Sequence, residues 1–114
     1  MITHVSTPLS GLKDSQARIQ ASAHNTSNVT TDAFARQAVT SAETRSGGVT
    51  SSVHTVELTA QGKSIAASLP GAQNNVNVVS ETVDRIAAQR SFEANANVVR
   101  TQDQLAKSLL DLTG

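Results

Sequence analysis

The feature that most constrains this chain is a run of 42 residues, Ala72 to Thr113, that contains neither glycine nor proline. The run is rich in Ala, Gln, Glu, Arg and Leu, which favour helix. A helix from Asn75 to Leu112 would be about 57 Å long at roughly 1.5 Å per residue. Because that length exceeds the width of a globule of 114 residues, the sequence predicts a long C-terminal helix in an elongated molecule.

Apolar and small residues recur along this segment at spacings of three and four, which is the pattern of a coiled-coil seam. The main stripe consists of Ala87, Ser91, Ala94, Val98, Thr101, Leu105, Leu109 and Leu112, and an upstream stripe consists of Val76, Val79, Val83 and Ile86. Glu81 and Asp84 fall outside them, so we expect both on the solvent face. The stripes predict that the helix packs against another helix.

A second helix is predicted near the N-terminus, with Thr7 as its N-cap and Pro8 at its first position. The same heptad-like spacing joins Leu9, Leu12, Gln16, Ile19, Ala23 and Thr26. The helix should end by Ser27, because the Asn, Ser and Thr side chains that follow compete for backbone hydrogen bonds. The economical arrangement packs the two stripes on each other, as an antiparallel or a parallel pair.

The middle of the chain is rich in Ser, Thr and Gly. Segments 39–44 and 49–58 could form a β-hairpin that turns at Gly47-Gly48, with a bulge near His54, or the region could be irregular. The expected fold is mainly α, with two long terminal helices pairing as a coiled coil. The expected regions are 1–34 (N-terminal helix and corner), 35–73 (small β or loop region) and 74–114 (C-terminal helix).

Composition narrows the possible functions. Leu, Ile, Val and Phe make up 26 of 114 residues, about 23%, near the roughly 20% below which chains tend not to fold, so the core should be thin. Nine basic residues balance nine acidic ones, and the chain has no cysteine. We therefore expect no nucleic-acid partner and no membrane insertion, and neither disulfides nor thiolate sites. Residues 1–15 carry no secretory leader pattern.

Few residues suggest chemistry. The histidines His4, His24 and His54 are too far apart in sequence to form a metal-ligand motif. Ser10 and Lys13 match S-x-x-K, but the companion motifs of serine acyltransferases are missing. We expect no enzyme activity, no catalytic or metal site and no cofactor.

The region from Ser10 to Phe34 resembles the N-terminal signature of bacterial flagellar rod and hook proteins, S-G-L followed by A-N-N-I-A-N-x-x-T-x-G-F. The matching positions after Ser10-Gly11-Leu12 are Asn25, Asn28, Thr31 and Phe34. The sequence departs from the signature at His24, Thr26, Ser27 and Ala33, the last standing where the family has glycine.

The C-terminal segment resembles the same family more specifically. Asn75-Val76-Asn77 with Glu81 and Val83 is similar to N-V-[DN]-x-x-x-E-x-V. Family positions also match at Gln89, Arg90, Phe92 and Asn95, and Thr101-Gln102-Asp103-Gln104-Leu105 is similar to T-x-D-x-[ML].

The resemblance implies a structural subunit of the flagellar rod or hook, located in the basal body or hook and exported by the flagellar apparatus without a cleaved leader. Its partners would be copies of itself, other axial proteins and the export apparatus. The alternative is a coiled-coil adaptor or export-associated protein that does not polymerise. The expected helix interface is Leu9, Leu12, Ile19, Val83, Ile86, Val98, Leu105, Leu109 and Leu112, with Gln16, Arg90 and Asn97 specifying register.

Overall fold

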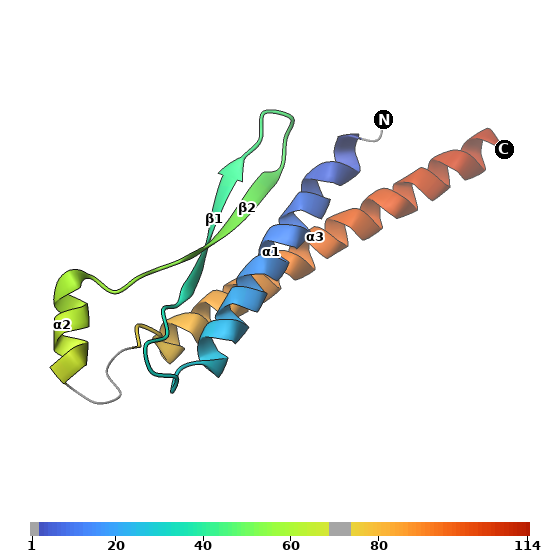
Figure 1. Cartoon of the computed structure of the whole chain (residues 1–114). Helices are drawn as coiled ribbons and strands as arrows, with labels where there is room; N and C mark the ends of the chain where they lie inside the picture. Colours follow the sequence, from blue (N-terminus) through green and yellow to red (C-terminus); the bar gives the residue numbers. More distant parts are fainter. Residues whose placement is uncertain (1–2, 69–73) are drawn as a thin grey trace.

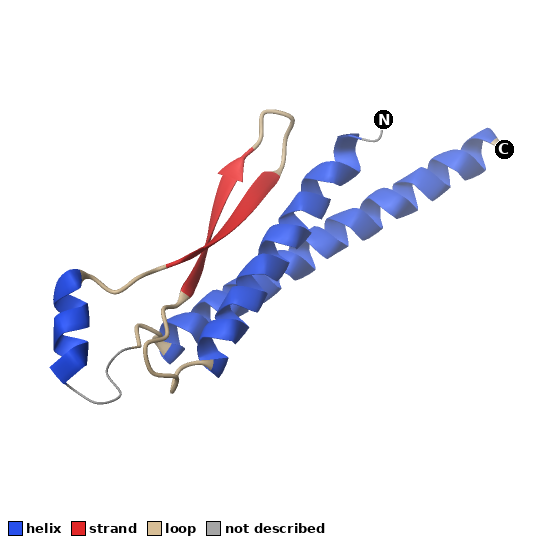
Figure 2. Cartoon of the chain, in the orientation of Figure 1, coloured by secondary structure: helices blue, strands red, loops and turns tan. Residues whose placement is uncertain are grey.

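The computed structural model describes residues 3–68 and 74–114 (Figure 1). In chain order the elements are α1 (Thr3–Ser27), β1 (Gln37–Glu43), β2 (Val49–Thr55), α2 (Ala60–Ser68) and α3 (Val78–Thr113). The chain is mainly helical, with a long helix at each end and a small hairpin between them (Figure 2). This confirms the predicted fold class.

The helices α1 and α3 lie side by side and run antiparallel, so the two termini lie at the same end of the molecule (Figure 1). The molecule measures 73 × 25 × 15 Å and has a radius of gyration of 19.5 Å. A compact domain of this length would have a radius of gyration of roughly 13 Å. The elongated shape therefore agrees with the prediction from the length of the C-terminal helix.

The start of α3 is fixed by a side-chain cap. Asn77 lies in an extended conformation, and its side chain accepts hydrogen bonds from the backbone N–H groups of Val79 and Ser80 at 3.0 and 3.2 Å. Asparagine is among the best N-cap residues, since its oxygen pairs with otherwise free N–H groups. The helix thus begins three residues later than Asn75, the expected start.

The start of α1 differs from the prediction. The helix already runs from Thr3, so Thr7 is not its N-cap and Pro8 lies inside it, buried. Proline has no N–H and cannot bond to the carbonyl four residues earlier.

The middle region forms an antiparallel hairpin, which settles the choice between a hairpin and an irregular segment. Pairing is continuous from Gln37 opposite Thr55 to Glu43 opposite Val49, so the bulge expected near His54 is wrong. Gly47 and Gly48 form the turn with φ of 85° and 95°, a conformation that glycine adopts without steric cost.

The helix α2 was not predicted, because Ser, Gly and Thr dominate its surroundings in the sequence. The Thr59 hydroxyl caps it by accepting a hydrogen bond from the Gly62 N–H at 3.1 Å. The helix lies apart from the α1–α3 pair (Figure 1). Residues 69–73, the end of the expected middle region, lie outside the described part of the chain.

The two predicted stripes do not pack on each other. The buried positions of the pair are instead small or polar: Pro8, Ser15, Ala21, Ser22 and Asn25 on α1, and Glu81 and Ala88 on α3. Small residues let the two backbones approach, while larger apolar side chains on the neighbouring faces stay outside. The large residues of the stripes are therefore not buried within the chain, and the expected exposure of Glu81 is wrong.

Ala33 has a φ of 58°, which is left-handed backbone. This conformation costs a residue with a Cβ roughly 1–2 kcal/mol. We expect Ala33→Gly to raise the free energy of unfolding by about 1 kcal/mol, measured by urea denaturation, even after the extra entropy of unfolded glycine is subtracted. Ala94→Gly, at an exposed position within α3, is the control and should lower it by about 1 kcal/mol. A loss of stability in both variants would contradict this account.

Candidate functional site

The end of α1, the start of β1 and the start of α3 meet at one buried amide. Asn25 is only 1% exposed. Its Nδ2 donates to Glu81 Oε1 at 2.9 Å and to the carbonyl of Gln37 at 2.8 Å, and its Oδ1 accepts from the Gln37 N–H at 2.7 Å. One side chain therefore joins three elements that are distant in sequence.

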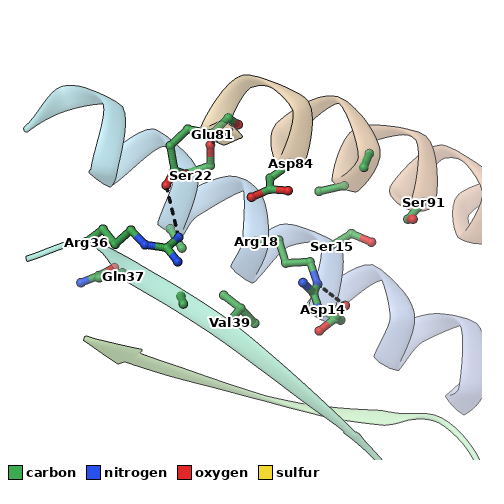
Figure 3. A pocket seen from close by; sticks show the side chains of 14 residues that line it. Asp14, Ser15, Arg18, Ser22, Arg36, Gln37, Val39, Glu81, Asp84 and Ser91 are labelled. Atoms are coloured by element: carbon green, nitrogen blue, oxygen red, sulfur yellow. Dashed lines mark hydrogen bonds and ion pairs between the residues drawn. The ribbon is translucent and has the colours of Figure 1, made fainter. Parts of the chain in front are cut away.

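Glu81 is the partner of this amide and is itself 3% exposed. Its backbone carbonyl accepts a hydrogen bond from the Ser22 hydroxyl at 2.8 Å, and Nη1 of Arg36 lies 3.8 Å from its Oε1 (Figure 3). A buried carboxylate is costly unless it is paired and hydrogen-bonded, and here both conditions are met. We call Ser22, Asn25, Arg36, Gln37 and Glu81 the polar junction.

Two further asparagines extend the polar junction to the base of the hairpin. Asn75 accepts from the Arg36 N–H and donates to the Val56 carbonyl, both at 2.7 Å. Asn74 donates to the carbonyls of Asn28 and Thr31 at 2.6 and 3.0 Å. These side chains replace backbone partners in a region without regular structure, so the segment before α3 holds both the corner after α1 and the hairpin.

The hairpin lies along α1 through polar contacts. The Ser10 hydroxyl accepts from the Val49 N–H at 3.0 Å. One turn later, Asp14 accepts hydrogen bonds from Ser41, from Ser51 at 2.7 Å and from Nε of Arg18 at 2.9 Å. Ser10 thus anchors the hairpin and also donates a hydrogen bond to the backbone of its own helix. Lys13 is exposed. The structure therefore gives the S-x-x-K pair, Ser10 and Lys13, no catalytic geometry.

The pKa of Asp14 reflects two opposed effects. Partial burial raises the pKa, while the hydrogen bonds from Ser41, Ser51 and Arg18 and the positive charge of Arg18 lower it. The hydrogen bonds and the charge together outweigh burial, so the pKa lies below its ordinary value of 3.8. The ionised carboxylate is therefore the form that holds the hairpin.

An open pocket of about 360 Å³ lies between α1, β1 and α3 (Figure 3). Asp14, Arg18, Arg36, Glu81 and Asp84 give it two positive and three negative side chains. Among the described residues no group of three His, Cys, Asp or Glu side chains could hold a metal ion. No helix in the described ranges is long and apolar enough to cross a membrane.

The outer surface of the helix pair is unusually apolar for a chain of this size. Exposed fractions are 46% for Leu9, 60% for Val83, 59% for Leu105, 61% for Leu109 and 82% for Leu112. Every residue from Asp103 to Gly114 is exposed. Single exposed apolar residues are ordinary, but a continuous row of them marks an interaction surface.

Residues 72–112 match the family described as flagellar basal body rod FlgEFG protein C-terminal. This segment belongs to the flagellar rod family. The match confirms the resemblance of the C-terminal motifs, and it gives the chain a structural role in the flagellar basal body. None of the curated proteins matches the chain.

The predicted interface residues are not buried within the chain. Leu12 and Ile19 are half-buried. The rest are exposed: Leu9, Val83, Ile86, Val98, Leu105, Leu109 and Leu112. Their place in an interface with another chain stays a prediction.

The family-motif residues fall into two groups. At the corner after α1, Asn25 occupies the polar junction, Asn28 donates to the His24 carbonyl at 2.9 Å and accepts from Thr31 at 3.2 Å, and the Phe34 ring lies 5.4 Å from that of His24. On α3, Gln89, Arg90 and Phe92 are exposed, whereas Asn95 lies against Gly11.

Sequence reasoning missed the roles of Asp14 and Glu81. Glu81 stands in the motif segment, so its identity was visible but not its burial. Asp14 carried no motif. The available signal was the row of polar residues Ser10, Asp14, Arg18 and Asn25 at spacings of four, four and seven, one polar face of α1.

We expect Asn25→Ala to lower the free energy of unfolding by about 1–3 kcal/mol, because the Glu81 carboxylate and the Gln37 backbone would lose buried partners. Asn28→Ala is the matched control, since its side chain bonds only within the exposed corner, and it should cost well under half as much. Thermal and urea denaturation measure both. Equal losses would show that Asn25 has no special role.

The lowered pKa of Asp14 predicts that the docking of the hairpin on α1 depends on pH. Because its folded pKa is depressed, its contribution to stability is present above the ordinary pKa of 3.8 and is lost as the pH falls through the folded value. The protection factors of the β1 and β2 amides, which are corrected for intrinsic exchange, should therefore fall in acid more steeply in the wild type than in Asp14→Asn. Subtracting the pH profile of the variant from that of the wild type removes the contribution of the other carboxylates. Parallel profiles for the two proteins would exclude Asp14 as the titrating group.

Proposed function

We propose that this chain is an axial structural subunit of the flagellar rod or hook that self-associates through the exposed faces of α1 and α3. The observation that carries the proposal is the inversion of the helix pair, with polar and small residues inside and large apolar residues outside. Helices arranged in this way gain their main apolar burial only from other chains. The family match on α3 supports flagellar axial proteins as those chains.

The two apolar faces lie on opposite sides of the helix pair. At 100° per residue, Leu12 and Ile19 point away from Asp14, which faces the hairpin. On α3, Ala87 and Ser91 line the pocket beside the hairpin, and Val98 and Leu105 continue their stripe. The two faces differ from each other and lie on opposite sides of the helix pair. They therefore favour heterologous, head-to-tail contacts between chains, which produce open helical assemblies.

The last turns of α3 supply the most exposed part of this surface. The C-terminal extension, residues 103–113, carries Leu105, Leu109, Leu110 and Leu112 at exposed fractions of 59%, 61%, 71% and 82%. In the proposed assembly a neighbouring helix covers these residues. Gln16, Arg90 and Asn97 are also exposed and would select the neighbour's position.

The remaining partners follow from the family. We propose transfer by the flagellar export apparatus without a cleaved leader, and a position in the periplasmic rod or the hook. The short hairpin region supports a slender subunit, as in the rod. It leaves little mass to decorate the outside of a tube.

We expect Leu105→Ala to weaken assembly strongly while leaving the monomer nearly as stable as the wild type. Leu105 is already 59% exposed, and surface substitutions typically change stability by less than about 0.5 kcal/mol. Lys107→Ala, on the same C-terminal extension, is the control and should assemble normally. Sedimentation, electron microscopy and the motility of a deletion strain that carries each variant provide the measurements.

Concentration gives an independent check of self-association. Because binding between folded chains stabilises the folded state, the wild-type Tm should rise with protein concentration. The rise should be smaller for Leu105→Ala. A wild-type Tm that does not change with concentration, together with full motility of Leu105→Ala, would contradict the proposal and favour a non-polymerising adaptor.

A further inference from the structure

Two contacts between α1 and α3 correspond to the same antiparallel alignment of the two helices. Asn25 bonds to Glu81 at one end of the pair. At the other end Gly11 meets Asn95, because a Cβ added at Gly11 would lie 2.7 Å from Nδ2 of Asn95 and 2.9 Å from its Cγ. In an antiparallel pair, the numbers of residues that face each other have a constant sum. The two contacts give 25 + 81 = 106 and 11 + 95 = 106.

The Asn95 side chain cannot easily leave this position. Its Nδ2 donates to the Ser91 carbonyl at 2.9 Å, so moving the amide away from α1 breaks a hydrogen bond. A Cβ at position 11 would require the end of the Asn95 side chain to move, with loss of its hydrogen bond to Ser91. Glycine at position 11 leaves the Asn95 amide in place, although alanine is the better helix former by about 1 kcal/mol.

We propose that Gly11–Asn95 and Asn25–Glu81 together determine the register of the helix pair. The Ser22 hydroxyl, which donates to the Glu81 carbonyl, acts at the same end as Asn25. Between the two ends, Ser15, Ala21 and Ala88 are small and offer little discrimination. A slip of one heptad would place Gln102 opposite Gly11 and Ala88 opposite Asn25. It would also leave Glu81 opposite residue 32, beyond the end of α1 at Ser27. The slip is disfavoured because Asn25 and Glu81 would lose their buried hydrogen bond, and because Asn95 would no longer lie against the one α1 position without a side chain.

The register has a consequence for the proposed assembly, on which this part of the inference rests. With a sum of 106, Thr3 at the start of α1 faces Asp103, and from Asp103 onward α3 is exposed throughout. A heptad slip would lengthen or shorten the C-terminal extension by seven residues, about 10 Å. The two contacts thus set how much of the Leu105–Leu112 surface reaches a neighbour.

The test measures register directly by spin labelling. The chain has no cysteine, so Lys13→Cys and Glu93→Cys, both exposed positions, can carry nitroxides. Labelled chains are diluted into an excess of unlabelled chains, and the label-to-label distance is measured by double electron–electron resonance. We expect one narrow distribution in the wild-type background and a shifted or broadened one in Gly11→Ala.

Rescue separates register from general stability. Gly11→Ala should lower the Tm, whereas Gly11→Ala combined with Asn95→Ala should restore the wild-type distance and raise the Tm above that of Gly11→Ala. Gly62→Ala in α2, the same change outside the pair, should leave the distance unchanged. An unchanged distance with a raised Tm in Gly11→Ala, or no rescue in the double variant, would overturn the proposal. Because the distance is measured within one chain, this outcome is independent of whether the chain assembles.

Discussion

The structure depends on the hydrogen bond between Asn25 and Glu81. Both side chains are almost fully buried, whereas the buried apolar residues among those described are Pro8, Ala21 and Ala88. Apolar burial therefore cannot select this arrangement. The polar junction can, because an unpaired buried amide or carboxylate is expensive and few alignments satisfy both groups. The end of α1, the base of the hairpin and the start of α3 are positioned by the same few atoms.

A polar interior has a functional counterpart on the surface. Since small and polar residues hold the helix pair together, the leucines and valines on the other faces remain available to neighbouring chains. Stability within the chain and affinity between chains then depend on different residues. The proposed assembly benefits from this separation, because its contact surface can be strongly apolar without changing how the two helices pair.

The hairpin is attached by the same kind of chemistry. Ser10, Asp14 and Arg18 present one polar face of α1 to the backbone and serines of the strands. Their contacts are directional, so they fix where the hairpin lies along the helix. Val39 and Val53, paired across the strands, add limited apolar contact, and Val53 is 52% exposed. The hairpin is therefore located by hydrogen bonds more than by packing.

The sequence by itself determined the local structure: a glycine- and proline-free run became α3, Gly47-Gly48 became the turn, and the motif residues identified the flagellar rod family. It also revealed the apolar stripes, because helical periodicity is a local property. It could not assign those stripes to a partner, and within the chain their large residues remain exposed. Which face lies inside depends on whether Asn25 can reach Glu81 and whether Gly11 can accommodate Asn95. Those contacts join residues 56 and 84 positions apart, so only the tertiary structure decided them.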